Sequence, residues 1–153
     1  MRLVRATAAE CEAMAYAHAT AFDEKSWRED EFDDLLEGEG IYGFLADDDG
    51  QPLGLILCRI AAGEVEILTV GVTPEARRRG VGLALMLAGL HVAREAGVAE
   101  AFLEVAVDND GAIALYAMLG FEKTGLRKAY YDRGPEGFTD ALVMRLDLNA
   151  AAA

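Results

Sequence analysis

The segment from Thr73 to Ala84 combines residue types that suit phosphate binding. Three adjacent arginines at positions 77–79 are followed by Gly80 and Gly82. Glycine lets the main chain turn tightly and approach a ligand closely, and free N–H groups at the start of a helix carry positive potential. The segment therefore predicts a main-chain site for a phosphate or pyrophosphate. The alternative interpretation is a solvated arginine cap on an ordinary turn.

The composition of the whole chain argues against several other classes of function. The chain has 153 residues, 53% of them hydrophobic, which suits one globular domain. Its net charge of −13 argues against general binding to nucleic acid or to an anionic membrane surface. Cys11 and Cys58 form neither a disulfide framework nor a metal-binding C-x-x-C pattern, and His18 and His91 have no partner at ligand spacing. We expect a cytoplasmic protein without a metal and without a membrane span.

Hydrophobic periodicity places the arginine segment between a strand and a helix. Strands are expected at Arg2–Arg5, Ile41–Ala46, Leu53–Ile60, Glu64–Val72, Ala101–Val107, Phe121–Tyr131 and Ala141–Leu146, and helices at Ala8–Ala19, Glu29–Glu37, Gly82–Ala96 and Gly111–Leu119. Thr7 and Glu10 predict a capping box at the first helix. This order predicts a mixed α/β sheet in one domain over residues 1–149, with residues 150–153 as a disordered tail.

Two motifs resemble those of the GNAT N-acetyltransferases. Residues 77–82, R-R-R-G-V-G, match the family's acetyl-CoA loop R/Q-x-x-G-x-G/A, whereas neither the Walker loop nor the dinucleotide pattern G-x-G-x-x-G is present. Residues 109–121 match the family's N-x-x-A-x-x-L-Y-x-x-x-G-F. The resemblance implies an α/β (α+β) GNAT fold with flanking helices, whose mostly antiparallel sheet splays between the strands Glu64–Val72 and Ala101–Val107. It also implies acetyl-CoA as co-substrate, and no metal.

The resemblance implies positions for the cofactor. In the family, the strand before the loop pairs with the pantetheine arm, and amides of the loop and first helical turn hold the pyrophosphate. The matching residues here are Val70, Gly71, Val72, Arg77, Arg78, Arg79, Gly80, Val81, Gly82, Leu83, Asn109 and Tyr116. Gly71 is the expected site of the strand bulge that splays the sheet, since glycine in a strand often marks a bulge or a close approach. An ordinary flexible glycine is the alternative.

Acetyl transfer to an amine needs a neutral amine, a thioester held near it and a proton donor for the departing thiolate. Tyr116 matches the family tyrosine near the thioester sulfur and is the predicted general acid, with a packed core tyrosine as the alternative. Glu104 and Glu66 are the two candidate bases. Strand alternation sets Glu104 opposite its apolar neighbours, and it is expected to set Glu66 on the face of Leu68 and Val70. For each glutamate, a solvated or salt-bridged strand residue is the alternative.

Further positions resemble the RimI subgroup, which acetylates the N-terminal alanine of a ribosomal protein. These are Glu104, Asn109, Tyr116, the run R-K-A-Y-Y at residues 127–131 and D-A-L-V-M at residues 140–144. In that subgroup the matching glutamate accepts the proton and the tyrosine donates one. The implied partner is a peptide or protein N-terminus, with Trp27 in the matching aromatic region as a substrate-binding residue. Tyr130 and Tyr131 are further candidates, since their rings and hydroxyls could clamp a peptide main chain, and an ordinary surface aromatic pair is the alternative.

The acceptor side departs from the subgroup in two places. The aromatic stretch from Phe22 to Trp27 lacks the proline that often precedes the tryptophan, and Ala106 stands where arginine is common. Two alternatives therefore accompany the prediction of N-terminal acetylation. One is an acetyltransferase for a small-molecule amine, and the other is a non-catalytic acyl-CoA-binding module.

Overall fold

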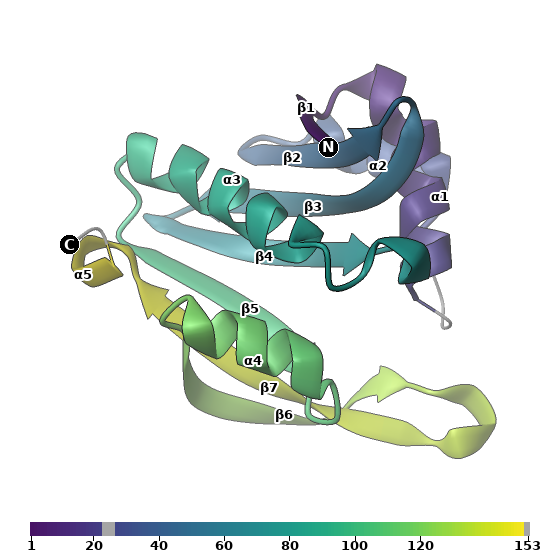
Figure 1. Cartoon of the computed structure of the whole chain (residues 1–153). Coiled ribbons are helices and arrows are strands. Elements are labelled where there is room, and N and C mark those ends of the chain that lie inside the picture. The colour runs from purple at the N-terminus through teal and green to yellow at the C-terminus, as the bar shows by residue number, and fades with distance from the viewer. Residues whose placement is uncertain (23–26, 152–153) are drawn as a thin grey trace.

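The computed structural model describes residues 1–22 and 27–151, which form one seven-stranded sheet with helices on both faces (Figure 1). The strands are β1 (Arg2–Arg5), β2 (Ile41–Asp48), β3 (Gln51–Ala61), β4 (Glu64–Val72), β5 (Glu100–Ala106), β6 (Glu122–Asp132) and β7 (Phe138–Asp147). Their order across the sheet is β1-β2-β3-β4-β5-β7-β6. Neighbouring strands are antiparallel except for β4 and β5, which are parallel. This mixed sheet confirms the predicted fold class.

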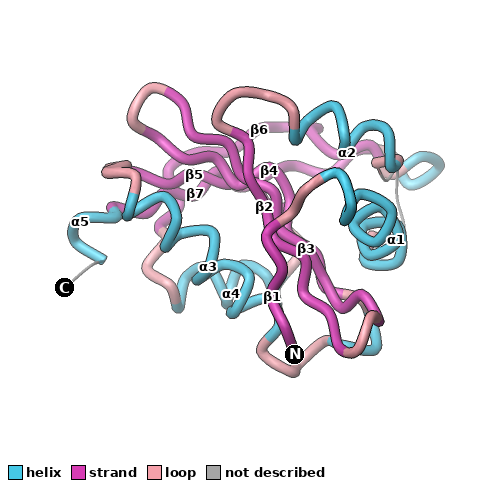
Figure 2. Tube along the Cα trace, turned by 90° about the horizontal axis from the view of Figure 1, so that it is seen from above, coloured by secondary structure: helices cyan, strands magenta, loops and turns pink. Residues whose placement is uncertain are grey.

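The helices divide between the two faces of the sheet. Helices α1 (Cys11–Ala21) and α2 (Glu29–Leu36) lie on one face, and α3 (Val81–Glu95) and α4 (Asp110–Met118) lie on the other (Figure 2). Shorter elements complete the described chain: η1 (Ala8–Glu10), η2 (Pro74–Ala76), η3 (Gly134–Glu136) and α5 (Leu148–Ala151). No helix within residues 1–22 and 27–151 is long and apolar enough to cross a membrane.

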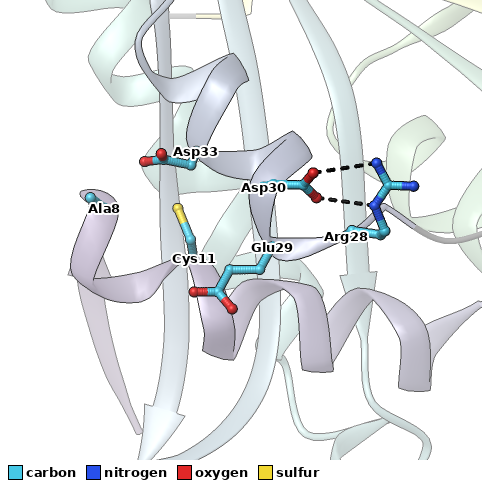
Figure 3. A pocket seen from close by; sticks show the side chains of 6 residues that line it. All are labelled: Ala8, Cys11, Arg28, Glu29, Asp30 and Asp33. Carbon is cyan, nitrogen blue, oxygen red and sulfur yellow. Dashed lines mark hydrogen bonds and ion pairs between the residues drawn. The ribbon is translucent and has the colours of Figure 1, made fainter.

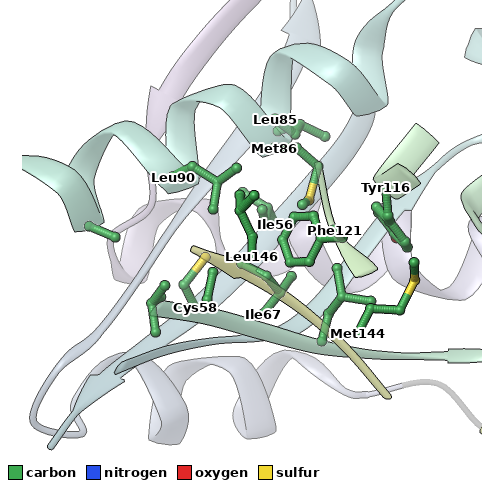
Figure 4. Packing of buried hydrophobic residues seen from close by; sticks show 14 of the residues in the cluster. Ile56, Cys58, Ile67, Leu85, Met86, Leu90, Tyr116, Phe121, Met144 and Leu146 are labelled. Atoms are coloured by element: carbon green, nitrogen blue, oxygen red, sulfur yellow. The ribbon is translucent and has the colours of Figure 1, made fainter. Parts of the chain in front are cut away.

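Each face of the sheet has its own apolar cluster. The cluster under α3 and α4 includes Leu85, Met86 and Leu90 of α3 packed on strand residues such as Ile56 (Figure 4). Full burial of one such aliphatic side chain contributes about 1.5–3 kcal/mol. The cluster under α1 and α2 is smaller and includes Met14, Phe32, Leu55 and Leu57. Side chains of β3 point alternately into the two clusters, so this strand holds both layers together.

The strands β4 and β5 part from each other midway along their length. Their parallel pairing ends at Ile67 and Leu103, although β4 continues to Val72 and β5 to Ala106 (Figure 1). The register of β4 against β3 shifts at Leu68, which is the extra residue of a β-bulge. A bulge bends its strand and increases the local twist, so it turns β4 away from β5 where the pairing stops. The predicted splay is confirmed.

Gly71 is not the bulge, and the prediction for that position was wrong. Gly71 pairs with Leu55 in regular register. A glycine is required there by a close approach, because a Cβ atom would lie 2.9 Å from Cε2 of Phe22 and 3.0 Å from Cβ of Ala21. The end of β4 therefore packs directly on the end of α1.

The remaining elements follow the sequence prediction closely. The capping box of Thr7 and Glu10 is present, although it caps η1 and α1 begins only at Cys11. Helix α5 extends through residues 150 and 151, where a disordered tail was expected. Residues 152–153 of that expected tail lie outside the described residues.

Candidate active site

The loop between β4 and α3 presents main-chain donors at the start of α3. Gly80 is the N-cap residue with φ of 78°, a left-handed conformation that favours glycine, and no side chain of the described residues caps the helix there. The amides of Val81, Gly82 and Leu83 therefore lack intrahelical acceptors. Arg78 is also left-handed, with φ of 65°. Such a run of N–H groups at the positive end of a helix dipole suits a pyrophosphate.

Two of the arginine side chains of this loop, those of Arg77 and Arg79, contact other parts of the protein. The Arg77 guanidinium donates to the main-chain oxygen of Val72 at 3.3 Å and to that of Ala21 at 3.0 Å. An Arg79 nitrogen lies 3.7 Å from a carboxylate oxygen of Asp48. The Arg77 side chain thus ties the loop to the ends of β4 and α1, which leaves the main-chain amides to form the phosphate site.

The first turn of α3 lies close to the end of β4 and to α4. A Cβ atom at Gly82 would lie 3.4 Å from Cδ2 of Leu115 on α4 and 3.6 Å from Cγ2 of Val72 on β4, so the first turn of α3 faces the gap between these elements. Asn109 is the N-cap of α4, where its side-chain oxygen accepts from the Ala112 amide at 3.2 Å. The free amides at the start of α3, the end of β4 and the start of α4 are therefore adjacent, which is the arrangement that the predicted acetyl-CoA site requires.

Tyr116 is buried on α4 and belongs to the apolar cluster beneath α3 and α4 (Figure 4). Its ring centroid lies 6.1 Å from that of Phe121 in an edge-on contact. Burial raises the pKa of Tyr116, and the nearby Tyr131 raises it further. The hydroxyl is therefore protonated at neutral pH and can donate to a departing thiolate. The side chain is packed in the core, as the alternative interpretation expected, and it is also protonated, as a general acid must be.

Glu104 is the first residue of β5 beyond the paired region. Its neighbours Leu103 and Val105 point into the cluster under α3 and α4, so its carboxylate lies on the opposite face of the sheet. Arg127 of β6 donates to both carboxylate oxygens, at 2.8 and 3.1 Å. The Tyr131 hydroxyl donates to the main-chain oxygen of Glu104 at 3.3 Å. The strand order β5-β7-β6 has brought a predicted base and a predicted substrate-binding residue together.

Glu66 lies before the strands part, opposite Phe102 in the paired region. Its carboxylate accepts from Arg59 of β3 at 2.7 Å, and the side chain is half exposed. The expectation that Glu66, Leu68 and Val70 share one face was wrong. The bulge reverses the alternation, so that Leu68 packs with the α1 cluster and Val70 with the α3 cluster.

Tyr130 and Tyr131 lie where the register between β6 and β7 shifts, so the regular alternation of side chains along β6 is interrupted there. Opposite this point, a carboxylate oxygen of Asp140 on β7 accepts from the Ala129 amide at 2.7 Å, and Ala129 is left-handed with φ of 52°. The two rings form an edge-on pair with centroids 5.0 Å apart. The guanidinium carbon of Arg127 lies 3.9 Å from the Tyr130 ring centroid. Both tyrosines are therefore part of the same cluster as Glu104.

Trp27 packs on His18, a residue to which the sequence assigned no role. The two rings stack with centroids 5.1 Å apart, and the Trp27 amide donates to Nδ1 of His18 at 3.3 Å. Burial lowers the pKa of His18 to about 4, while Glu31 acts in the opposite direction. The neutral ring fixes the chain just before α2. The sequence could have indicated this buried role, because His18 lies next to Ala17 on the buried face of α1. Residues 23–26 of the expected aromatic stretch lie outside the described residues.

A hollow of about 550 Å³ between α1 and α2 contains none of the predicted site residues (Figure 3). Its lining is Ala8, Cys11, Arg28, Glu29, Asp30 and Asp33. Burial raises the pKa of Cys11, and acidic neighbours add to this, so the thiol is protonated and a poor nucleophile. Arg28 forms an ion pair with Asp30, with 3.0 Å between Nε and Oδ1. Within the described ranges, no group of His, Cys, Asp or Glu could hold a metal ion.

A family model described as Acetyltransferase (GNAT) family matches residues 7–121. This chain belongs to the GNAT acetyltransferase family. It is 30% identical to the [Ribosomal protein bS18]-alanine N-acetyltransferase of Escherichia coli K12 over 133 residues, or 87% of this chain and 85% of that protein. It is 44% identical to the N-alpha-acetyltransferase RimI of Mycobacterium tuberculosis over 84 residues, or 55% of this chain and 49% of that protein.

Solved structures agree with this assignment. The crystal structure of the ribosomal-protein-S18-alanine N-acetyltransferase from Escherichia coli matches with a TM-score of 0.87 and 27% identity, covering 96% of this chain and 93% of that one. The predicted GNAT fold, its similarity to RimI and acetyl-CoA as co-substrate are confirmed. The protein is an acetyl-CoA-dependent N-acetyltransferase.

A Gly82→Val substitution tests the pyrophosphate site. The added methyl groups would enter the gap between Val72 and Leu115 and obstruct the approach to the first-turn amides. We expect acetyl-CoA binding, measured by calorimetry, to weaken about tenfold or more, which corresponds to roughly 1.4 kcal/mol. Arg78→Ala is the matched control, since it removes only an exposed charge and should change affinity by less than about threefold. Unchanged binding by Gly82→Val would place the pyrophosphate elsewhere.

His18 predicts a pH dependence of stability. Its pKa is about 4 in the folded protein and roughly 6.5 when unfolded, so the unfolded chain binds more protons between these values. This contribution to the free energy of unfolding is therefore complete above pH ~6.5 and is lost as the pH falls toward ~4. His18→Phe should give a shallower decline across that window in urea titrations. His91→Phe, at an exposed position, is the control. Equal slopes for wild type and His18→Phe would contradict the assignment.

Proposed function

We propose that this enzyme acetylates the α-amino group of a protein N-terminus, with the N-terminal alanine of a ribosomal protein as the preferred acceptor. The observation that carries the proposal is the cluster of Glu104, Tyr130 and Tyr131 at the point where β4 and β5 part. The E. coli relative is an alanine N-acetyltransferase and the M. tuberculosis relative an N-alpha-acetyltransferase, which supports the same class of substrate. A cytoplasmic location is part of this proposal.

The two predicted proton-transfer residues lie on opposite faces of the sheet. Tyr116 belongs to the cluster under α3 and α4, and Glu104 projects from the other face. The phosphate loop also precedes α3, so acetyl-CoA would enter from the side of α3 and α4. The acceptor would then reach the thioester from the side of α1, α2 and the β6–β7 hairpin. Separate entrances favour direct transfer in a ternary complex, without a covalent acyl-enzyme.

The residues of this chain divide the work of the reaction. Acetyl-CoA supplies the activated thioester. Glu104 accepts the proton of the attacking amine, directly or through one water, as nitrogen bonds to the carbonyl carbon. Tyr116 donates a proton to the sulfur as the C–S bond breaks. Tyr130 and Tyr131 offer ring surface and hydroxyl groups to the acceptor main chain, and Trp27 forms an aromatic surface beside α2.

A panel of acceptors tests the proposed function. Purified protein is mixed with acetyl-CoA and each acceptor, and free thiol is counted over time. We expect peptides that begin with alanine to release thiol at least about tenfold faster than polyamines, because a peptide main chain can accept and donate hydrogen bonds to the tyrosine pair that a polyamine chain lacks. Fastest release with polyamines would favour the small-molecule alternative. Binding of acetyl-CoA without thiol release by any acceptor would favour the non-catalytic alternative.

Tyr116→Phe tests the general acid. The variant keeps the packed ring and removes the hydroxyl, so we expect kcat to fall about tenfold or more while acetyl-CoA affinity stays near that of wild type. Tyr16→Phe, which alters an exposed tyrosine of α1, is the matched control. Turnover by Tyr116→Phe equal to wild type would leave Tyr116 with a packing role alone.

A further inference from the structure

We propose that Arg127 is a positioning residue that cancels the charge of Glu104 and so keeps the bound acceptor amine in its reactive neutral form. The inference rests on the proposed function, since it takes Glu104 as the base. Arg127 itself touches neither the reacting nitrogen nor the thioester. It acts through the carboxylate that it holds.

The contacts of Arg127 fix its guanidinium on two sides. One nitrogen, Nη1, donates to both oxygens of Glu104, at 2.8 and 3.1 Å. The guanidinium carbon also lies 3.9 Å from the centroid of the Tyr130 ring. The Glu104 side chain is 24% exposed and that of Arg127 is 53% exposed, so the carboxylate is the better shielded partner. The ion pair raises the already high pKa of Arg127, which is therefore charged at every pH of interest.

The chemistry explains why a cation should accompany this base. An acceptor α-amine has a pKa of about 7.7–8.0 and arrives largely as an ammonium, which cannot attack a thioester. An opposite charge within about 4–6 Å typically shifts such a pKa by about 1–3 units in favour of the charged form. A lone Glu104 carboxylate would therefore hold the acceptor as an unreactive ammonium. The Glu104–Arg127 pair carries no net charge, so the acceptor meets a weaker negative potential, while the carboxylate oxygens keep lone pairs that can accept a proton.

Several charged residues of the strands beside Glu104 form ion pairs of their own. On β4, Glu66 pairs with Arg59 of β3 at 2.7 Å. Between β7 and β5, Arg145 pairs with Glu100 at 2.8 Å. These pairs leave little net charge on the adjacent strands.

Charged residues of β6, of β7 and of the segment after β5 also occur in oppositely charged pairs. Asp108, which follows β5, pairs with Arg133 of the β6–β7 hairpin at 2.9 Å. Asp140 of β7 and Lys128 of β6 carry opposite charges on adjacent strands, and the Tyr131 hydroxyl donates to the main-chain oxygen of Glu104. The ion pair between Arg127 and Glu104 is thus the contact that sets the net charge next to the acceptor amine.

Arg127→Gln tests the inference through separate measurements of kcat and KM. Steady-state rates are measured from about pH 6 to 9.5 with whichever amine the wild type acetylates fastest. The acidic limb of kcat reports ionisations in the bound complex, and we expect it to move upward by about one pH unit. At pH values below this limb, kcat and the acceptor KM of Arg127→Gln should both be lower than those of wild type by a similar factor, up to about tenfold. The reason is that the unpaired carboxylate binds the acceptor as an unproductive ammonium. A merely structural role would instead lower kcat/KM.

Two further variants complete the experiment. Arg127→Lys retains the positive charge and should restore most of the wild-type kcat profile. Arg59→Gln removes the cation from Glu66 and should leave the profile unchanged. Arg127→Ala is a second neutral variant, and thermal unfolding of every variant reports whether it folds.

The outcomes separate this inference from the proposed function. An unshifted kcat limb in both folded neutral variants, with an active wild type, would overturn the role of Arg127 alone. A shift in Arg59→Gln but not in Arg127→Gln would also overturn it and would indicate Glu66 as the base. A wild type that acetylates only small amines would refute the proposed acceptor while the test of Arg127 still runs on those amines. No turnover with any amine would overturn both.

Discussion

The parting of β4 and β5 is the constraint on which the rest of the structure depends. Two adjacent parallel strands normally satisfy each other's main-chain N–H and C=O groups, and leaving such groups unpaired is unfavourable. Here the pairing ends at Ile67 and Leu103, and the bulge at Leu68 turns β4 away. A cofactor arm that carries amide groups can form the missing hydrogen bonds. In the proposed mechanism, the thioester lies in this gap between the two faces of the sheet.

The loop and helix that hold the cofactor are tied to the acceptor side of the molecule by packing and hydrogen bonds. Arg77 links the end of β4 to the last turn of α1, and Gly71 allows these two elements to touch. From α1, His18 holds Trp27 at the entrance to α2. A continuous set of contacts therefore joins the phosphate loop to the aromatic residues proposed for the acceptor. The neutral state of His18 is a result of that burial.

Much of the fold could be predicted from local pattern, but the faces of the strands near the bulge could not. Strict alternation placed Glu66 and Val70 on one face, and a single extra residue at Leu68 reversed it. Nothing in the residue type of Leu68 indicates a bulge, whereas Gly71 carries the usual signal for one and has a different role. The partners of Arg77 and His18 were also missed, because each bond joins segments that the sequence separates.

The sequence by itself determined the elements and the family, and it predicted the phosphate loop. These depend on short-range properties: hydrophobic periodicity, helix caps, and glycines whose conformations are set by their neighbours in the chain. Only the tertiary structure decided which charges meet. Glu104 and Arg127 meet because only β7 separates their strands, and Tyr116 is buried in the larger apolar cluster because α4 packs on that face of the sheet. Such contacts arise from strand order and layer packing, which no local pattern encodes.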